Sequence, residues 1–381
     1  MTTTRDLGPN QHLIGKKDSK RRLMTPAMVL DLDVLEANIT RMAAFAADNG
    51  LALRPHSKTH KSIAIANKQI EVGALGVCCA TLGEAEVMVG GGVAGVMITS
   101  PVVQDVKVET VAALNARADG LMVAVDCMAN VVALEAAAAV TGTPVRLMVD
   151  VDVGLHRTGT TEVGQAVEIA RKATDSEHLE FAGIQGYGGH LQHIGAFSDR
   201  EAATRRDLQP LVDVRDALVG EGLAPPIVTG GGTGTHDIDA KLDLFTELQV
   251  GSYTVMDVQY LDVEPQSDAW NFASALVVRA TVVSANHDGS ATIDAGLKCF
   301  ATDGPVPNFA GGTPVGSEYQ YFGDEHGRVV FEGANEKLDL GGTVDCVVPH
   351  CDPTINLHDV YHCVRGDMLV DIWPVDSRGR H

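Results

Sequence analysis

Short apolar runs alternate with amphipathic stretches over the first two thirds of the chain. After a first run at 28–33, Leu35, Ile39 and Met42 recur on one face of a helix that begins near Val34. Eight further runs predict strands at 51–57, 76–81, 96–100, 121–126, 145–153, 181–188, 226–231 and 247–253. Helical stretches separate most of these runs, for example at 59–72, 129–141, 163–174 and 199–221.

Eight strands with helical crossovers predict a TIM-type (β/α)8 barrel, and an open doubly wound sheet is the alternative. The run at 28–33 is supernumerary to such a barrel and is expected to lead in from a second domain. After about residue 262 the pattern changes to strands joined by glycine-containing turns, without long helices between them. These strands are expected at 276–284, 291–294, 328–332 and 343–348.

The pattern therefore divides the chain into three parts. We expect an α/β barrel over 26–262 and an all-β domain over 263–381. An N-terminal segment over 1–25 is expected to associate with the β domain, with residues 1–24 irregular or forming an added strand.

Composition narrows the class of protein. The chain has 381 residues, a hydrophobic content of 45% and no apolar run of transmembrane length. Its net charge of −21 disfavours nucleic acid and anionic membranes as partners. Seven cysteines without regular spacing indicate a reducing compartment, and the polar N-terminus lacks the apolar core of a secretory signal. We therefore expect a cytoplasmic protein.

A basic cluster, Arg54-Pro55-His56-Ser57-Lys58-Thr59-His60-Lys61, follows the first predicted barrel strand. Barrel enzymes keep their chemistry at the C-terminal ends of strands. A lysine there can form a Schiff base with an aldehyde cofactor if burial and cationic neighbours lower its pKa, whereas spacing alone equally allows a solvated lysine. The cluster resembles, position for position, the motif R-P-H-x-K-x-H-K of the D-threonine aldolase and D-serine dehydratase family. Those are pyridoxal phosphate enzymes of the alanine-racemase fold.

The resemblance assigns roles within this cluster. It implies that Lys58 carries pyridoxal 5'-phosphate and that His56 belongs to the cofactor site. Lys61 is then expected to be a bystander on the face of a helix.

Two donor-rich loops follow predicted barrel strands seven and eight, where barrels commonly bind phosphate. Consecutive glycines let backbone N–H groups approach an anion, although a plain tight turn also explains the first loop. Both stretches resemble phosphate loops of the family. The expected phosphate-binding residues are Thr229, Gly231, Gly232, Thr233, Gly234, Gly251, Ser252 and Tyr253.

Two further side chains resemble family residues that contact the cofactor ring. Arg157 follows predicted strand five, and the resemblance places it near the phenolic oxygen, where a cation favours the phenolate. An arginine in a surface salt bridge is the alternative. Tyr187 ends predicted strand six and resembles the family residue beneath the pyridine ring.

His350 and Asp352 resemble the metal pair of the family. If they lie in a strand, residues i and i+2 project from one face, and Cys351 points the other way. Imidazole and carboxylate suit Mn²⁺, Mg²⁺, Co²⁺ or Zn²⁺, although a two-residue pair is a weak signal by itself. The dehydratases of the family typically show His-x-Cys here, so His-x-Asp favours cleavage of a carbon–carbon bond.

His193 matches a Gln-His pair of the aldolase branch and could take a proton from the substrate's β-hydroxyl. A structural histidine is the alternative. Gly189-His190 departs from the Gly-Ser of the aldolases, which bears on substrate preference.

The resemblance extends from Thr25-Pro26 to Trp373-Pro374. It implies a pyridoxal phosphate- and metal-dependent aldolase that cleaves D-3-hydroxy-α-amino acids, such as D-threonine or 3-hydroxy-D-aspartate, to glycine and acetaldehyde or glyoxylate. It also implies a homodimer, with the β domain of one subunit closing the barrel mouth of the other. One alternative is a dehydratase (ammonia-lyase) on the same scaffold. The other is a non-catalytic carrier of pyridoxal phosphate, which the β domain and its His350–Asp352 pair argue against.

Overall fold

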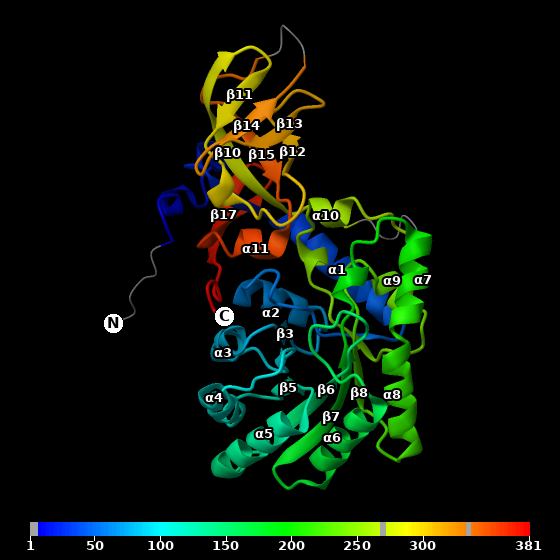
Figure 1. The fold of residues 1–381 in the computed structure, drawn as a ribbon. Coiled ribbons are helices and arrows are strands. Elements are labelled where there is room, and N and C mark those ends of the chain that lie inside the picture. Colours follow the sequence, from blue (N-terminus) through cyan, green and yellow to red (C-terminus); the bar gives the residue numbers. More distant parts are fainter. Residues whose placement is uncertain (1–6, 267–271, 333–336) are drawn as a thin grey trace, which may run out of the picture.

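The computed structural model describes residues 7–266, 272–332 and 337–381, and these form a lower barrel and an upper β sheet in Figure 1. The barrel sheet has eight parallel strands in the order β2-β9-β8-β7-β6-β5-β4-β3. Seven of them lie within predicted runs: β2 Ala52–Leu53, β3 Cys78–Cys79, β4 Met97–Ile98, β5 Met122–Val125, β6 Val145–Asp150, β8 Ile227–Gly230 and β9 Glu247–Leu248. The eighth, β7 Leu179–Gly186, begins two residues before its predicted run and overlaps most of it.

The basic cluster itself closes the barrel between β2 and β3. His56 and Cys78 form a parallel bridge. The Cys78 N–H donates to the Pro55 carbonyl at 2.8 Å, and the Ser57 N–H donates to the Cys78 carbonyl at 2.8 Å. The predicted (β/α)8 barrel is thus confirmed, and the open sheet is wrong.

Helices surround the barrel, and their bounds correct two predictions. The helix expected from residue 59 begins at Ile63, and the helix expected over 199–221 is divided in two near Pro210, which suits only the first turn of a helix. The helices are α1 Leu32–Asp48, α2 Ile63–Glu71, α3 Leu82–Gly90, α4 Asp105–Asn115, α5 Met128–Thr141, α6 Val163–Asp175, α7 Phe197–Asp207, α8 Gln209–Gly220, α9 His236–Asp239, α10 Val258–Leu261 and α11 Cys351–Ile355.

The second sheet is mostly antiparallel and follows the order β13-β14-β11-β10-β1-β16-β17, with β15 and β12 paired beyond β10. The supernumerary strand, β1, pairs with β10 and β16 in this sheet, as expected. Periodicity did not single out β12, β13, β16 and β17. The strands are β1 Ala27–Asp31, β10 Leu276–His287, β11 Ser290–Ile293, β12 Asn308–Gly311, β13 Glu318–Tyr321, β14 Gly327–Val330, β15 Thr343–Val347, β16 Val360–Arg365 and β17 Met368–Pro374.

The N-terminal segment is irregular from residue 7 onward, and residues 1–6 lie outside the described part. It contains two short 3-10 helices, η1 Gln11–Leu13 and η2 Ser19–Arg22. Leu13 and Leu23 pack in one apolar cluster with Leu369 of β17. We propose the division of the chain near residue 262, because the β-rich texture begins there. No helix among the described residues is long and apolar enough to cross a membrane.

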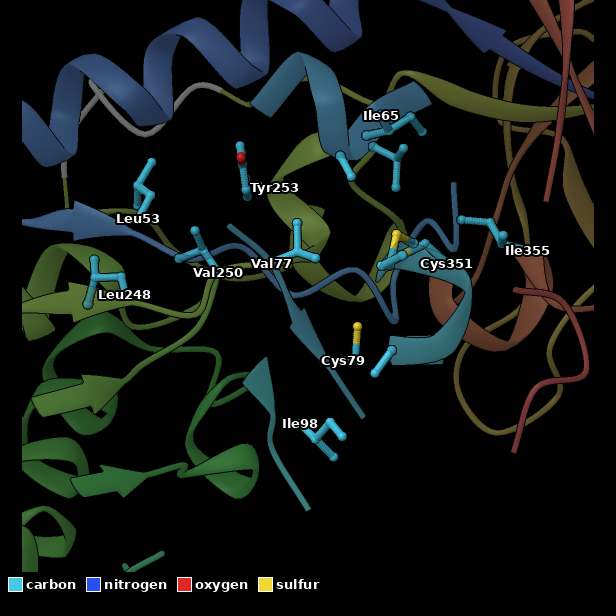
Figure 2. Close-up of a cluster of buried hydrophobic side chains, with 14 of the residues drawn as sticks. Leu53, Ile65, Val77, Cys79, Ile98, Leu248, Val250, Tyr253, Cys351 and Ile355 are labelled. Carbon is cyan, nitrogen blue, oxygen red and sulfur yellow. The ribbon is translucent and has the colours of Figure 1, made fainter. Parts of the chain in front are cut away.

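One apolar core continues from the barrel into α11 (Figure 2). Barrel residues such as Val77 and Leu248 are 0% exposed, and so are Cys351 and Ile355 of α11. Burial of such side chains contributes roughly 1.5–3 kcal/mol each. This packing seats α11, which carries the predicted metal pair, against the C-terminal ends of the barrel strands.

Candidate active site

A cavity of about 150 Å³ lies where the barrel meets α11. It brings together ten of the residues singled out from the sequence: His56, Lys58, Tyr187, His193, Gly232, Thr233, Gly251, Ser252, His350 and Asp352. These residues come from segments nearly three hundred positions apart, so the fold rather than local sequence assembles them.

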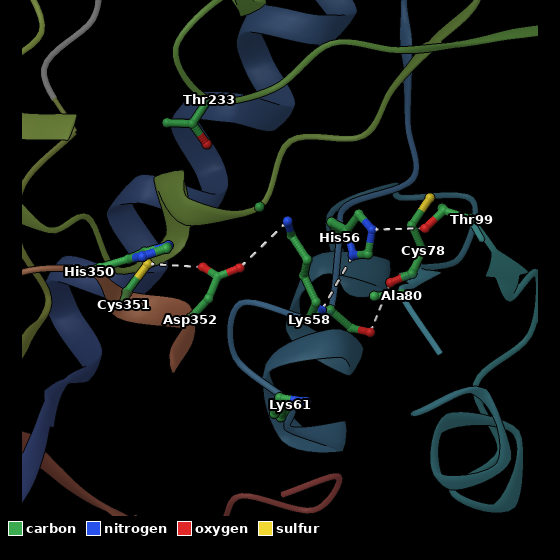
Figure 3. A network of polar contacts seen from close by, with 12 residues as sticks. His56, Lys58, Lys61, Cys78, Ala80, Thr99, Thr233, His350, Cys351 and Asp352 are labelled. Carbon is green, nitrogen blue, oxygen red and sulfur yellow. Dashed lines mark hydrogen bonds and ion pairs between the residues drawn. The ribbon is translucent and has the colours of Figure 1, made fainter. Parts of the chain in front are cut away.

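The Lys58 side chain points toward the carboxylate of Asp352 (Figure 3), and the ring of Tyr187 lies near its ammonium group. Its Nζ atom is 3.8 Å from Asp352 Oδ1 and 5.5 Å from the Tyr187 ring centroid. Burial lowers the pKa of Lys58, but Tyr187 and Asp352 raise it more, so the net shift is upward. The expectation of a lowered pKa is therefore wrong for this arrangement, because the nearest charges are anionic as well as cationic.

His56 and Arg157 border the same lysine. His56 Nδ1 accepts the Lys58 N–H at 3.4 Å, and its Nε2 pairs with Thr99 Oγ1 at 3.2 Å. Burial and the Lys58 charge hold the pKa of His56 well below 6.5, so its imidazole is neutral. The Arg157 guanidinium lies 5.5 Å from the Tyr187 ring centroid and lines an adjoining cavity with His56 and Lys58. Arg157 thus faces Lys58 and Tyr187 from the adjoining cavity.

Lys61 is not on a helix face, which corrects the prediction from the sequence. It precedes α2 in a turn, adopts a left-handed backbone with φ 51°, and is only 7% exposed. Its Nζ atom donates to Glu84 Oε1 at 2.5 Å within the core. The lysine pairs there because an unpaired buried charge is costly. Lys61 fixes the turn after Lys58 and does not line the cavity.

The two glycine loops meet at one wall of the cavity. The Tyr253 N–H donates to Thr233 Oγ1 at 3.0 Å, which ties the loops together. A Cβ atom on Gly232 would lie 2.4 Å from Gln192 Oε1, and one on Gly251 would lie 2.7 Å from Thr59 Oγ1. A side chain at either position would collide with these neighbours, and both glycines line the cavity with backbone alone. This cradle fits a phosphate group.

Four of the expected phosphate residues lie behind the cavity wall instead of lining it. Gly231 abuts Asp239, Gly234 abuts Gln192, and the Tyr253 hydroxyl accepts a hydrogen bond from Gln69 at 3.0 Å in the core. Thr229 is buried at the end of β8, and its hydroxyl has no partner within the described residues. These residues shape the loops from behind.

Asp239 is a buried carboxyl group that the sequence did not single out. It follows the first glycine loop on α9 and accepts a hydrogen bond from Thr235 Oγ1 at 2.6 Å. A Cβ atom on Gly231 would lie 2.4 Å from Asp239 Oδ2, and Gly231 has φ +69°. Burial raises the pKa of Asp239 from 3.8 to about 8, against the hydrogen bond from Thr235. The group is therefore neutral at pH 7.

Replacing Asp239 by asparagine should make the protein less sensitive to alkaline pH. The folded protein binds a proton that the unfolded chain releases near pH 4, so stability falls as pH rises from about 4 to about 8. From pH 6 to pH 8 the wild type should lose about 2–3 kcal/mol relative to Asp239→Asn. Urea unfolding at both pH values measures the difference. The exposed carboxylate of Asp213 provides a control, as Asp213→Asn, and an equal difference at both pH values contradicts the prediction.

The predicted metal pair lies at the start of α11 and not in a strand. His350 is the N-cap residue, with extended backbone angles, and Asp352 is in the first helical turn. The strand argument for a shared face is therefore wrong, although both side chains still line the cavity. Cys351 is buried, and its sulfhydryl donates to Asp352 Oδ2 at 3.3 Å.

The chemistry of this pair fits a divalent cation. His350 Nδ1 pairs with Asp303 Oδ2 at 2.9 Å, an arrangement that leaves Nε2 as the ligating nitrogen, as carboxylates do behind metal-bound histidines. Burial raises the pKa of Asp352, but Lys58 and His350 lower it more, so the carboxylate is ionised. Across the described residues, no group of three or more His, Cys, Asp or Glu side chains is arranged for a metal. A cation here would complete its shell with water or substrate, as Mg²⁺ and Mn²⁺ often do.

His193 stands beside this pair. Its ring packs on that of Tyr260 with 4.5 Å between centroids. Burial and the neighbouring His350 lower the pKa of His193 to about 4, so its imidazole is neutral at pH 7. The nearby His190, which departs from the aldolase pattern, pairs with Asp207 at 2.9 Å and does not line the cavity.

Several cavity residues carried no signal in the sequence. Tyr260 lies beyond the last barrel strand, and Gln249 is one residue from the end of β9. Gln185 lines the adjoining cavity and donates to the Thr99 carbonyl at 2.8 Å and to Asp150 Oδ1 at 2.9 Å. Tyr260 and these two amides match no catalytic motif, so residue type alone did not mark them.

The chain is similar to known proteins along most of its length. Residues 30–258 match the family "Alanine racemase, N-terminal domain", and residues 275–364 match the "Putative serine dehydratase domain". The chain is 37% identical over 363 residues to the 3-hydroxy-D-aspartate aldolase of Paracoccus denitrificans (strain Pd 1222), covering 94% of this chain and 93% of that protein. The crystal structure of D-threonine aldolase from Filomicrobium marinum superposes with a TM-score of 0.90 at 36% identity, covering 94% and 96% of the two chains.

A dehydratase is more distant than these aldolases. The D-threo-3-hydroxyaspartate dehydratase of Delftia sp. (strain HT23) is 27% identical over 380 residues, covering 94% of this chain and 98% of that protein.

Proposed function

The chain belongs to the alanine-racemase-fold family that includes D-threonine aldolases, 3-hydroxy-D-aspartate aldolases and D-serine dehydratases, and from this premise we propose that it is a pyridoxal phosphate-dependent aldolase. Its substrates are D-3-hydroxy-α-amino acids of the D-threonine or 3-hydroxy-D-aspartate type. It breaks the Cα–Cβ bond and releases glycine and an aldehyde. The observation that carries the proposal is the single cavity shared by Lys58, the two glycine loops and the His350–Asp352 pair.

The barrel would hold the cofactor. Lys58 would bind its aldehyde carbon, and Gly232, Thr233, Gly251 and Ser252 would offer backbone and hydroxyl donors to its phosphate. When bound, pyridoxal phosphate acts as an electron sink for negative charge at the substrate's Cα atom. The glycine cradle and the position of the lysine across the cavity support this orientation.

The β domain and His193 act on the substrate's β-hydroxyl. His350 and Asp352 would hold a divalent ion of the Mn²⁺, Mg²⁺, Co²⁺ or Zn²⁺ class, which lowers the pKa of a hydroxyl bound to it. His193, neutral at pH 7, accepts the proton of that hydroxyl. The oxygen's electrons then form the aldehyde as the Cα–Cβ bond breaks, and a proton at Cα completes glycine.

We further propose a cytoplasmic homodimer. Seven free cysteines support a reducing compartment. The dimer rests on the family resemblance, in which one β domain closes the other barrel.

A product screen tests the proposed reaction. The holoenzyme is incubated with D- and L-threonine and with D- and L-3-hydroxyaspartate, with and without a chelator. We expect glycine with acetaldehyde or glyoxylate from the D isomers alone. Keto acid and ammonia without glycine would instead identify a dehydratase, and no turnover of any isomer would favour a carrier of the cofactor.

A further inference from the structure

A buried carboxylate joins the barrel to the β domain beside the cavity. Asp257 is 0% exposed and caps α10, where its Oδ1 accepts the Tyr260 N–H at 3.0 Å. Its Oδ2 accepts the Cys351 N–H at 2.8 Å, from the first residue of α11. One side chain thus caps a helix of the barrel and holds the start of a helix in the β domain.

Backbone hydrogen bonds beside Asp257 also join the two domains. The Val258 N–H donates to the Val348 carbonyl at 3.0 Å, and the Gln259 N–H donates to the Pro349 carbonyl at 3.4 Å. Met256, just before the carboxylate, adopts φ 53°, a conformation that residues other than glycine rarely take. Such backbone persists only where its surroundings hold it, so the segment before α10 is fixed.

Each partner of Asp257 is adjacent to a group of the proposed reaction. Cys351 lies between His350 and Asp352 in the chain. The hydrogen bond from its N–H group to Asp257 fixes the first turn of α11. Tyr260 packs on the His193 ring with 4.5 Å between centroids. Asp257 itself does not line the cavity.

We propose that Asp257 is a positioning residue that fixes the His350–Asp352 pair against His193. This inference rests on the proposed function of those three residues. A carboxylate is required because it accepts from two N–H groups that approach from different segments. Asparagine keeps one acceptor oxygen and turns an N–H₂ group toward the second donor, so it can satisfy only one of them.

The test compares Asp257→Ala and Asp257→Asn with a matched control in the same chain. Asp31 caps α1 and also accepts two backbone N–H groups, from Asp33 at 3.0 Å and Val34 at 3.2 Å, but both belong to its own helix. Asp31→Ala therefore removes a helix cap without touching the junction. Mn²⁺ affinity is measured by electron paramagnetic resonance titration, and amide hydrogen exchange is measured in peptides covering 348–354 and 258–262.

We expect Asp257→Ala to weaken Mn²⁺ binding by about 10–100-fold and to speed exchange in both peptides, with Asp257→Asn in between. Asp31→Ala should leave Mn²⁺ affinity and both peptides unchanged. Wild-type affinity and exchange in Asp257→Ala overturn the inference. If the wild-type protein binds no Mn²⁺, the proposed metal role fails, while the exchange measurement still decides whether Asp257 holds the junction.

Discussion

Replacing Lys58 by alanine should remove at least ~10³-fold of the aldolase activity, which corresponds to about 4 kcal/mol. The same change should abolish the visible absorption of lysine-bound pyridoxal phosphate, which should make the purified wild-type protein yellow. The reason is positional, because Lys58 supplies the amine in the cavity that the glycine loops line. Absorption spectra and glycine release from D-threonine measure both effects. Full activity in Lys58→Ala would remove the basis of the proposed function.

Lys61, the second lysine of the cluster, provides a control for this prediction. Lys61 is paired with Glu84 at 2.5 Å and is buried away from the cavity. Lys61→Met leaves that carboxylate unpaired in the core, which costs roughly 3–5 kcal/mol. We therefore expect opposite behaviour from two lysines three positions apart. Lys58→Ala keeps the fold and loses the colour, whereas Lys61→Met keeps the colour at low temperature and loses stability.

The sequence predicted the barrel well because its strands are buried on both faces. Such strands appear as continuous apolar runs, and all eight lie at the expected places. Strands of the second sheet such as β13 Glu318–Tyr321 are short and partly exposed, so their alternation of polar and aromatic residues is too brief to single out. Their pairing depends on neighbours distant in sequence, which periodicity does not reveal.

The site could be predicted only where its residues resemble those of the family. The motif around Lys58 and the His350–Asp352 pair were expected from their resemblance to the family, since residue type alone equally allowed a solvated lysine and gave only a weak signal for a metal pair. The role of Lys61 could not be predicted, because its partner Glu84 comes from α3. Asp239 and Asp257 were missed for the same reason, since a lone aspartate in the sequence does not reveal that it is buried.

The His350–Asp352 pair should be as necessary for aldol cleavage as Lys58, but for a different chemical reason. His350→Ala should lower aldol cleavage at least ~10³-fold, about 4 kcal/mol, and chelation of the wild type should have the same effect. His350 is the cleaner choice for this test because Asp352 also lies 3.8 Å from Lys58 Nζ, so its removal would disturb the lysine as well. The visible absorption of the cofactor should persist in His350→Ala, since Lys58 keeps its neighbours. Initial rates with added Mn²⁺ provide the measurement.

Asp303 supplies the graded control for this prediction. It accepts from His350 Nδ1 at 2.9 Å and orients the ring without lining the cavity. Asp303→Asn should therefore weaken Mn²⁺ binding by about 10–100-fold and be rescued by more metal, whereas His350→Ala should resist rescue. If Asp303→Asn folds normally, loses activity and regains it with added Mn²⁺, then Asp303 orients the His350 ligand and does not itself supply a ligand. If chelated wild type and His350→Ala both cleave D-threonine at the normal rate, the metal role is wrong, and the lysine and its cofactor alone must account for cleavage.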